Sequence, residues 1–147
     1  MPHLLSIEEL NILCKNTMIE HLGIEFIEAS KGFIIARMPV DNRTIQPMKR
    51  LHGGASMAFA ETVGSAGSMM LVDPNHFAVL GVEISGSHVG TTTEPYVLAE
   101  ARIVHQGKSS HVWEIRIQDQ KGTLISVSRL TNRIIPIRPL AAKGELS

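Results

Sequence analysis

The chain has 147 residues, of which 44% are hydrophobic and 19% are charged, and its formal net charge is zero. This length predicts one domain with a substantial core. The balanced charge excludes the strongly basic character typical of proteins that bind nucleic acid or acidic membrane surfaces. Because Cys14 is the single cysteine, an internal disulfide and a thiol-rich zinc site are excluded, and a reducing, cytoplasmic location is expected.

The first half of the chain predicts short helices followed by a hairpin. Residues 1–22 carry two helix-start patterns, one at Ser6 and one at Asn16. They have no apolar stretch followed by a small-residue cleavage site, so we expect no signal peptide. The runs 23–30 and 33–40 flank a Lys-Gly turn and predict two antiparallel strands. Residues 41–50 are polar, contain a proline and predict a loop.

A long segment, Leu51 to Val72, contains a single charged side chain, that of Glu61. Its small and apolar residues predict a helix over 53–71 that ends before Asp73. Four glycines, a histidine and the glutamate make the segment only weakly apolar. We therefore expect a helix buried in a protein interior, and no membrane span.

Four strand-like runs follow the helix, at 77–89, 96–106, 111–119 and 123–134. Hydrophobic residues alternate with polar ones from Trp113 onward, and the short turns between the runs favour antiparallel pairing. Glycines at positions 81 and 86 suggest bulges or a close backbone approach.

Together these elements predict an α+β domain over 23–135, in which one buried helix packs on a curved antiparallel sheet. Residues 1–22 form an N-terminal helical segment, and 136–147 are expected to form a loose tail. The open edges of such a sheet favour dimerisation.

The isolated carboxylate of Glu61 is the strongest candidate for a chemical role. Burial of an unpaired carboxylate is costly, and general bases and nucleophiles are common reasons to accept that cost. Gly53 and Gly54 would begin the helix, where free N–H groups and the positive end of the helix dipole can stabilise a developing oxyanion.

The spacing of these two features predicts a shared site. Gly53 and Glu61 are eight residues apart, which is about 12 Å along a helix. Both cannot contact one carbonyl from a single chain, so we expect Glu61 to act opposite Gly53 of a second copy and the monomer to be inactive. Ser65 would lie on the same helical face as Glu61.

The sequence QPMKRLHGGASMAFAETVGS, at residues 46–65, resembles the hotdog-fold acyl-CoA thioesterases, in particular the small enzymes that hydrolyse aromatic acyl thioesters. The similarity extends over about residues 16–134 and includes GVEISGSHV from residue 81, GKSSHVW from residue 107 and SVSRLT from residue 126. It implies a hotdog fold, in which a curved sheet wraps one long helix, and hydrolysis of an aromatic or medium-chain acyl-CoA.

The resemblance also implies roles for individual residues. Glu61 would attack the thioester or activate water, the N–H of Gly53 would polarise the carbonyl, and Ser65 would hold the water or the carboxylate. Gln46 and His52 would line the thioester. Other substrate contacts are expected from Met57, Ser68, Met69, Val82, His88, Lys108, Ser109 and Ser110. Close relatives carry an arginine where this chain has Gly90, so Lys108 would bear more of the contact with the CoA phosphates.

The resemblance further implies the partners of the chain. The substrate would be an acyl-CoA, and the chain would form a homodimer, with a dimer of dimers as the expected tetramer. No nucleic acid, membrane, metal or cofactor is expected, since coenzyme A is part of the substrate. The histidines show no close metal-ligand spacing.

Less specific interpretations remain open for each residue and for the whole chain. Glu61 could be a structural acid, His52 a helix cap, and the Ser65 hydroxyl could bond to the Glu61 carbonyl. The other histidines are expected at the surface: His3, His21, His76, His105 and His111. The alternative functions are a hotdog dehydratase or hydratase that uses His52 with Glu61, and a non-catalytic acyl-CoA binding module.

Overall fold

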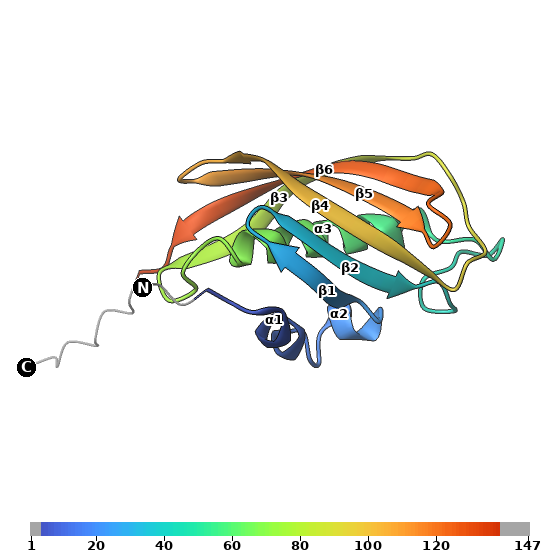
Figure 1. Ribbon diagram of the computed structural model, residues 1–147, viewed down its shortest axis with the longest axis horizontal. Helices are drawn as coiled ribbons and strands as arrows, with labels where there is room; N and C mark the ends of the chain where they lie inside the picture. Colours follow the sequence, from blue (N-terminus) through green and yellow to red (C-terminus); the bar gives the residue numbers. More distant parts are fainter. Residues whose placement is uncertain (1–3, 139–147) are drawn as a thin grey trace, which may run out of the picture.

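The computed structural model describes residues 4–138, which form one antiparallel sheet around a long helix (Figure 1). In chain order the elements are α1 (Ile7–Leu13), α2 (Met18–His21), β1 (Glu25–Ser30), β2 (Phe33–Pro39), α3 (Gly53–Met69), β3 (Phe77–His88), β4 (Tyr96–Gln106), β5 (Ser110–Asp119) and β6 (Leu124–Pro136). The expected α+β class, a curved sheet around one helix, is confirmed. The predicted tail lies outside the described residues from position 139 onward.

The strand order is β1-β2-β4-β5-β6-β3, and every pair is antiparallel. The strands β4, β5 and β6 follow one another through short turns, as expected. β3 also pairs in the antiparallel direction, as expected, but a loop over 89–95 follows it in place of a short turn, and its partner is β6, the last strand. Consequently β3 forms one edge of the sheet and β1 forms the other.

The helix α3 corresponds to the uncharged segment of the sequence and forms the centre of the core. Phe59, Ala60 and Val63 of α3 are completely buried, together with alternate residues of the strands. Gly67 lets the ring of Trp113 approach the helix backbone, and Gly64 does the same for Leu130. No helix among residues 4–138 has the length and hydrophobicity needed to cross a membrane.

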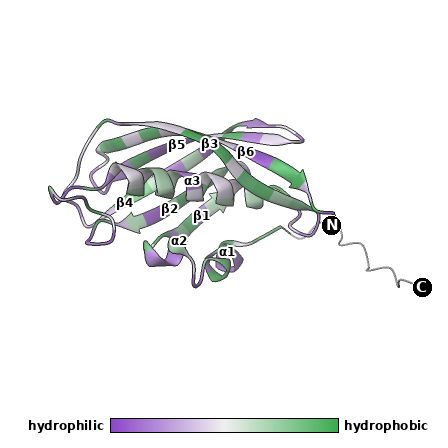
Figure 2. Ribbon diagram, turned by 180° about the vertical axis from the view of Figure 1, so that it is seen from behind, coloured by the Kyte–Doolittle hydropathy of each residue, from purple (hydrophilic) through white to green (hydrophobic). Residues whose placement is uncertain are grey.

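The short helices α1 and α2 lie on the side of α3 that faces away from β5 and β6, as Figures 1 and 2 both show. Ser6 begins α1 with a capping box, in which its hydroxyl accepts from the N–H of Glu9 and its N–H donates to the Glu9 carboxylate. Thr17 caps α2. The predicted cap at Asn16 is therefore one residue too early, and Asn16 instead has a left-handed φ of 59°.

Asn11 of α1 occupies the open edge of β1 at Phe26. Its side-chain amide donates to the carbonyl of Phe26 at 3.1 Å and accepts from the N–H of Phe26 at 3.0 Å, as a neighbouring strand would. The side chain thus pairs an edge residue that would otherwise be available to another chain.

Replacement of Asn11 should therefore destabilise the protein. We expect Asn11→Ala to lower the free energy of unfolding by about 1–3 kcal/mol, because both backbone groups of Phe26 lose a partner. Urea unfolding followed by circular dichroism measures this change. Asn42→Ala, in an exposed loop, is the matched control and should change little. Equal stability of the two variants would contradict the role of Asn11.

Candidate active site

Glu61 lies in the middle of α3 and is half-buried, as the sequence predicted. Its carboxylate points toward Gly81 of β3, where any side chain would collide with Oε1. The expectation of a close backbone approach at Gly81 is therefore confirmed, and the register of β3 also shifts there. Within residues 4–138 the carboxylate makes no hydrogen bond or ion pair, whereas a structural acid would be held by such partners.

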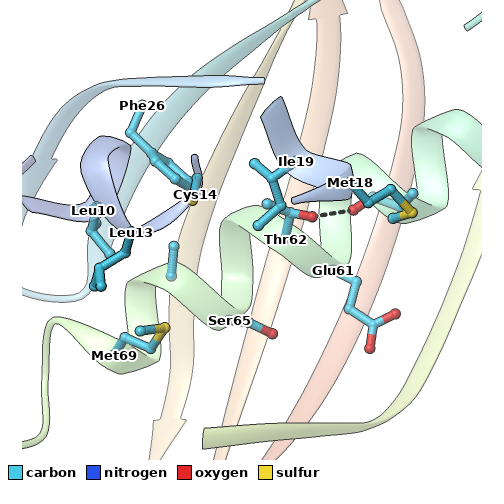
Figure 3. Close-up of a pocket in the computed structure, with 12 residues that line it drawn as sticks. Leu10, Leu13, Cys14, Met18, Ile19, Phe26, Glu61, Thr62, Ser65 and Met69 are labelled. Atoms are coloured by element: carbon cyan, nitrogen blue, oxygen red, sulfur yellow. Dashed lines mark hydrogen bonds between the residues drawn. The ribbon is translucent and has the colours of Figure 1, made fainter. Parts of the chain in front are cut away.

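Glu61 borders an apolar groove of about 510 Å³ between α3 and the N-terminal elements (Figure 3). Leu10 of α1, Met18 of α2 and Phe26 of β1 form part of the opposite wall. On α3 the wall includes Met69, as expected, together with polar groups of Glu61, Thr62 and Ser65. The groove thus combines a long apolar surface with a few polar groups, as ligand sites commonly do.

The hydroxyls of Thr62 and Ser65 are used differently. Thr62 donates to the carbonyl of Ala58 at 2.7 Å, one turn earlier in the helix (dashed in Figure 3). Ser65 donates to Oδ1 of Asn132 on β6 at 3.2 Å, and not to the Glu61 carbonyl. The alternative in which Ser65 bonds back to its own helix is therefore wrong.

The N-terminus of α3 is capped by His52. Its Nδ1 accepts from the N–H of Gly54 at 2.7 Å, and its carbonyl accepts from the N–H of Ser56 at 3.1 Å. The cap interpretation of His52 is thus confirmed. The N–H of Gly53 donates to no group within residues 4–138, so it is free to meet a ligand. His88 of β3 lies beside it, since a Cβ placed on Gly53 would be 2.7 Å from its Nε2.

The helix geometry separates Gly53 from Glu61 within one chain. Because α3 is continuous over 17 residues, their eight-residue separation corresponds to about 12 Å. The two residues therefore cannot act on one carbonyl carbon from the same chain.

Gln46 is half-buried in the loop before α3, and its own loop holds it. Its N–H donates to the Arg50 carbonyl at 2.9 Å, and its Oε1 accepts from the N–H of Met48. An isolated bridge between Ile45 and Leu51 closes the same loop. The side-chain amide group of Gln46 is left available as a donor.

Other predicted contacts lie outside the groove of a single chain. Met57 packs near Gly86, whose Cβ would lie 2.7 Å from the Met57 methyl, and this confirms the expected close approach at that glycine. Val82 and His88 are exposed on the edge strand β3. Lys108, Ser109 and Ser110 lie at the turn into β5, and Lys108 borders a separate cavity of about 600 Å³ near Leu71.

The prediction for Ser68 requires correction. Its position seven residues after Glu61 does place it on a similar helical face, but the side chain is completely buried. Trp113 Nε1 donates to its hydroxyl at 2.8 Å, so strand β5 covers this part of the helix. Ser68 is therefore a core residue and does not line the groove.

His111, expected at the surface, is also buried, with 2% exposure. Its Nδ1 lies 2.9 Å from the Ser68 hydroxyl. Burial, and secondarily the charge of His105, lowers the pKa of the His111 ring. His21, His76 and His105 are exposed as expected, whereas His3 lies outside the described residues.

Two features of the site were missed by the sequence analysis: the groove wall from α1 and α2, and Asn132. Asn132 occupies an inward-facing position of β6, in phase with buried Ser128 and Leu130. An amide side chain at a buried alternate position, between Leu130 and Ile134, was a usable signal. Among residues 4–138, no three His, Cys, Asp or Glu side chains form a cluster suited to a metal ion.

Comparison with known proteins gives consistent results. The family described as "Thioesterase superfamily" matches residues 48–126. The proofreading thioesterase EntH of Klebsiella pneumoniae is 38% identical over 131 residues, which is 89% of this chain and 95% of EntH. The solved structure of the thioesterase HI1161 from Haemophilus influenzae has a TM-score of 0.89 at 36% identity, covering 96% of this chain and 98% of that one. A mutant of the thioesterase PA1618 from Pseudomonas aeruginosa has a TM-score of 0.88 at 36% identity, covering 92% and 97%.

Proposed function

This chain belongs to the thioesterase superfamily, and we propose that it hydrolyses acyl-CoA thioesters to a free acid and coenzyme A with Glu61 as the essential carboxylate. The observation that carries the proposal is the half-buried carboxylate of Glu61 at an apolar groove, which has no partner among residues 4–138. An acyl group fits such a groove, and a carboxylate without partners is free to act on its thioester.

The chemistry requires one bond to form and one to break at the acyl carbon. Glu61 either takes a proton from an attacking water or attacks the carbonyl itself, in which case water hydrolyses the resulting anhydride. The carbonyl oxygen becomes negative as the new bond forms, and the free N–H of Gly53 at the start of α3 would stabilise it. The C–S bond then breaks, and in the second route this step forms the anhydride that water hydrolyses. The coenzyme A thiolate leaves and takes up the proton that the attacking water gives up.

We propose that this site forms between two copies of the chain. The strand β3 presents a 12-residue edge, and its Leu80 and Val82 are 53% and 57% exposed. Asn11 already pairs Phe26 at the opposite edge of the sheet, on β1, which favours β3 as the edge that pairs with a second copy. A two-fold dimer would let Gly53 of each copy serve Glu61 of the other. Assembly of two dimers into a tetramer stays a prediction.

The remaining predicted residues would contact the rest of the substrate. His88 lies beside Gly53 and would meet the substrate near the thioester. Lys108 is exposed at the β4–β5 turn and, with Ser109 and Ser110, would contact the phosphates of the CoA arm. The cap bond of His52 disfavours the dehydratase alternative, because Nδ1 of the ring already serves the helix.

The test is release of free thiol from a panel of benzoyl-CoA, phenylacetyl-CoA, hexanoyl-CoA and lauroyl-CoA. We expect turnover of at least one member, because the groove accepts an apolar acyl group. Mass spectrometry of the same mixtures separates the alternatives, since a binding module would retain the acyl-CoA unchanged. Dehydration of added β-hydroxyacyl-CoA without thiol release would instead support the dehydratase. Either result would contradict hydrolysis as the function.

A further inference from the structure

A buried polar network connects the groove to the interior of the sheet through Asn132. Besides accepting from Ser65, Asn132 donates through Nδ2 to the Ser68 hydroxyl at 2.9 Å and to the carbonyl of Gly64 at 3.3 Å. Asn132 and Ser68 are completely buried, and Trp113 and His111 are 1% and 2% exposed. Ser65 is the member that reaches the groove.

Hydrogen-bond counting assigns one orientation to the amide of Asn132. The carbonyl of Gly64 can only accept, so the NH₂ group must face it and Oδ1 must face Ser65. The Ser68 hydroxyl supports the same assignment. It accepts from the indole N–H of Trp113 and from Asn132, which leaves its own proton to donate to Nδ1 of His111.

This assignment determines what Ser65 can offer to the groove. Its proton is directed to Asn132, so its oxygen lone pairs remain for a ligand. Glu61, one turn earlier on the same face, is also an acceptor when ionised. A water between them could donate one proton to each, with its lone pair left for the acyl carbon.

We propose that Asn132 is a positioning residue that keeps the Ser65 hydroxyl as an acceptor for the water that Glu61 activates. The inference rests on the proposed function and adds a residue in the core to it. Without Asn132, the Ser65 proton can turn to the carbonyl of Glu61, one turn earlier in the helix, and Thr62 makes this type of bond to Ala58 on α3. The hydroxyl would then turn away from its present direction.

A double-mutant cycle tests the proposal, with kcat and KM measured on the acyl-CoA that wild type hydrolyses fastest. We expect Ser65→Ala and Asn132→Leu each to lower kcat by roughly tenfold with KM nearly unchanged, and the double variant to be no slower than the slower single variant. If the loss of kcat in the double variant equals the product of the two single losses, Asn132 acts independently of Ser65 and the proposal is overturned. A wild-type kcat in Asn132→Leu would overturn it as well.

Loss of stability must be separated from loss of positioning. Ile34→Val, at a fully buried position of β2, is the control: it should lower Tm without changing kcat. Asn132→Asp provides a second variant with the native side-chain shape. Protonated, its carboxyl retains an acceptor for Ser65 and a donor for Gly64 or Ser68. Ionised, it loses the donor but still accepts from Ser65, so Asn132→Asp should retain a higher kcat than Asn132→Leu in either protonation state. A kcat of Asn132→Asp as low as that of Asn132→Leu would overturn the proposal.

The same experiments distinguish failure of this inference from failure of the proposed function. If Glu61→Gln is as active as wild type, the function assigned to Glu61 is wrong, and the inference with it. If Glu61→Gln is inactive while the losses of kcat in Ser65→Ala and Asn132→Leu multiply in the double variant, the proposed hydrolysis is supported. In that case the role of Asn132 alone is overturned.

Discussion

Glu61→Gln should lower kcat for thioester hydrolysis by at least about a hundredfold, whichever acyl-CoA the protein prefers. The substitution preserves the size of the side chain and removes its negative charge. A neutral amide can neither accept the proton of an attacking water nor attack the carbonyl, so both mechanisms open to Glu61 lose their central group. Free thiol release under saturating substrate measures the loss.

The structure indicates that the Glu61→Gln protein will fold. Because the carboxylate has no ion pair or hydrogen bond within residues 4–138, its replacement breaks no interaction there. Glu28→Gln, at an exposed position of β1, is the matched control and should retain wild-type kcat. Equal kcat in Glu61→Gln and wild type would show that the carboxylate is structural.

The long helix could be predicted because its signal is local. An uncharged run between an N-terminal cap and a proline places α3 to within two residues of its observed end at Met69. The chemical role expected of Glu61 also follows from local sequence, since one charge in an apolar run must lie at a boundary of the core. The half-buried position of Glu61 confirms the expected burial, and its chemical role stays a prediction.

The strand order could not be predicted in the same way. The pairing of β3 with β6 joins segments about 50 residues apart, and no turn between them marks the contact. The same limit explains Ser68 and His111. Helical spacing predicts the face of α3 on which Ser68 lies. It does not show that β5 crosses this part of the helix and buries Ser68 beneath His111 and Trp113.

The groove wall illustrates a second limit. The hydrophobic residues of α1 and α2 show that these helices pack on something, but Leu10 and Met18 are separated from α3 by more than 30 residues. Their position opposite Glu61 is therefore a tertiary result. By contrast, the sequence did predict close contacts at the glycines 81 and 86. In the structure Glu61 lies against Gly81 and Met57 lies against Gly86.

The second prediction concerns the N–H of Gly53, which we propose comes from a different copy of the chain than Glu61. Gly53→Pro should lower kcat by about a hundredfold or more, because it removes the one N–H proposed to stabilise the oxyanion. Gly53 is the first residue of α3, where proline is well tolerated, and His52 already has the extended φ and ψ of −71° and 130° that precede proline. Gly53→Ala retains the N–H and measures the cost of the added Cβ beside His88.

Mixing two inactive variants then tests whether the site is shared. In a heterodimer of Glu61→Gln with Gly53→Pro, one site carries both substitutions and the other carries neither. Random reassociation makes half of the dimers mixed, so about a quarter of all sites should be intact and activity should return to that level. If Glu61 and Gly53 acted within one chain, every site would retain one substitution and the mixture would stay inactive. Recovery of activity on mixing therefore requires that each acyl group be held between Glu61 of one copy and Gly53 of the other.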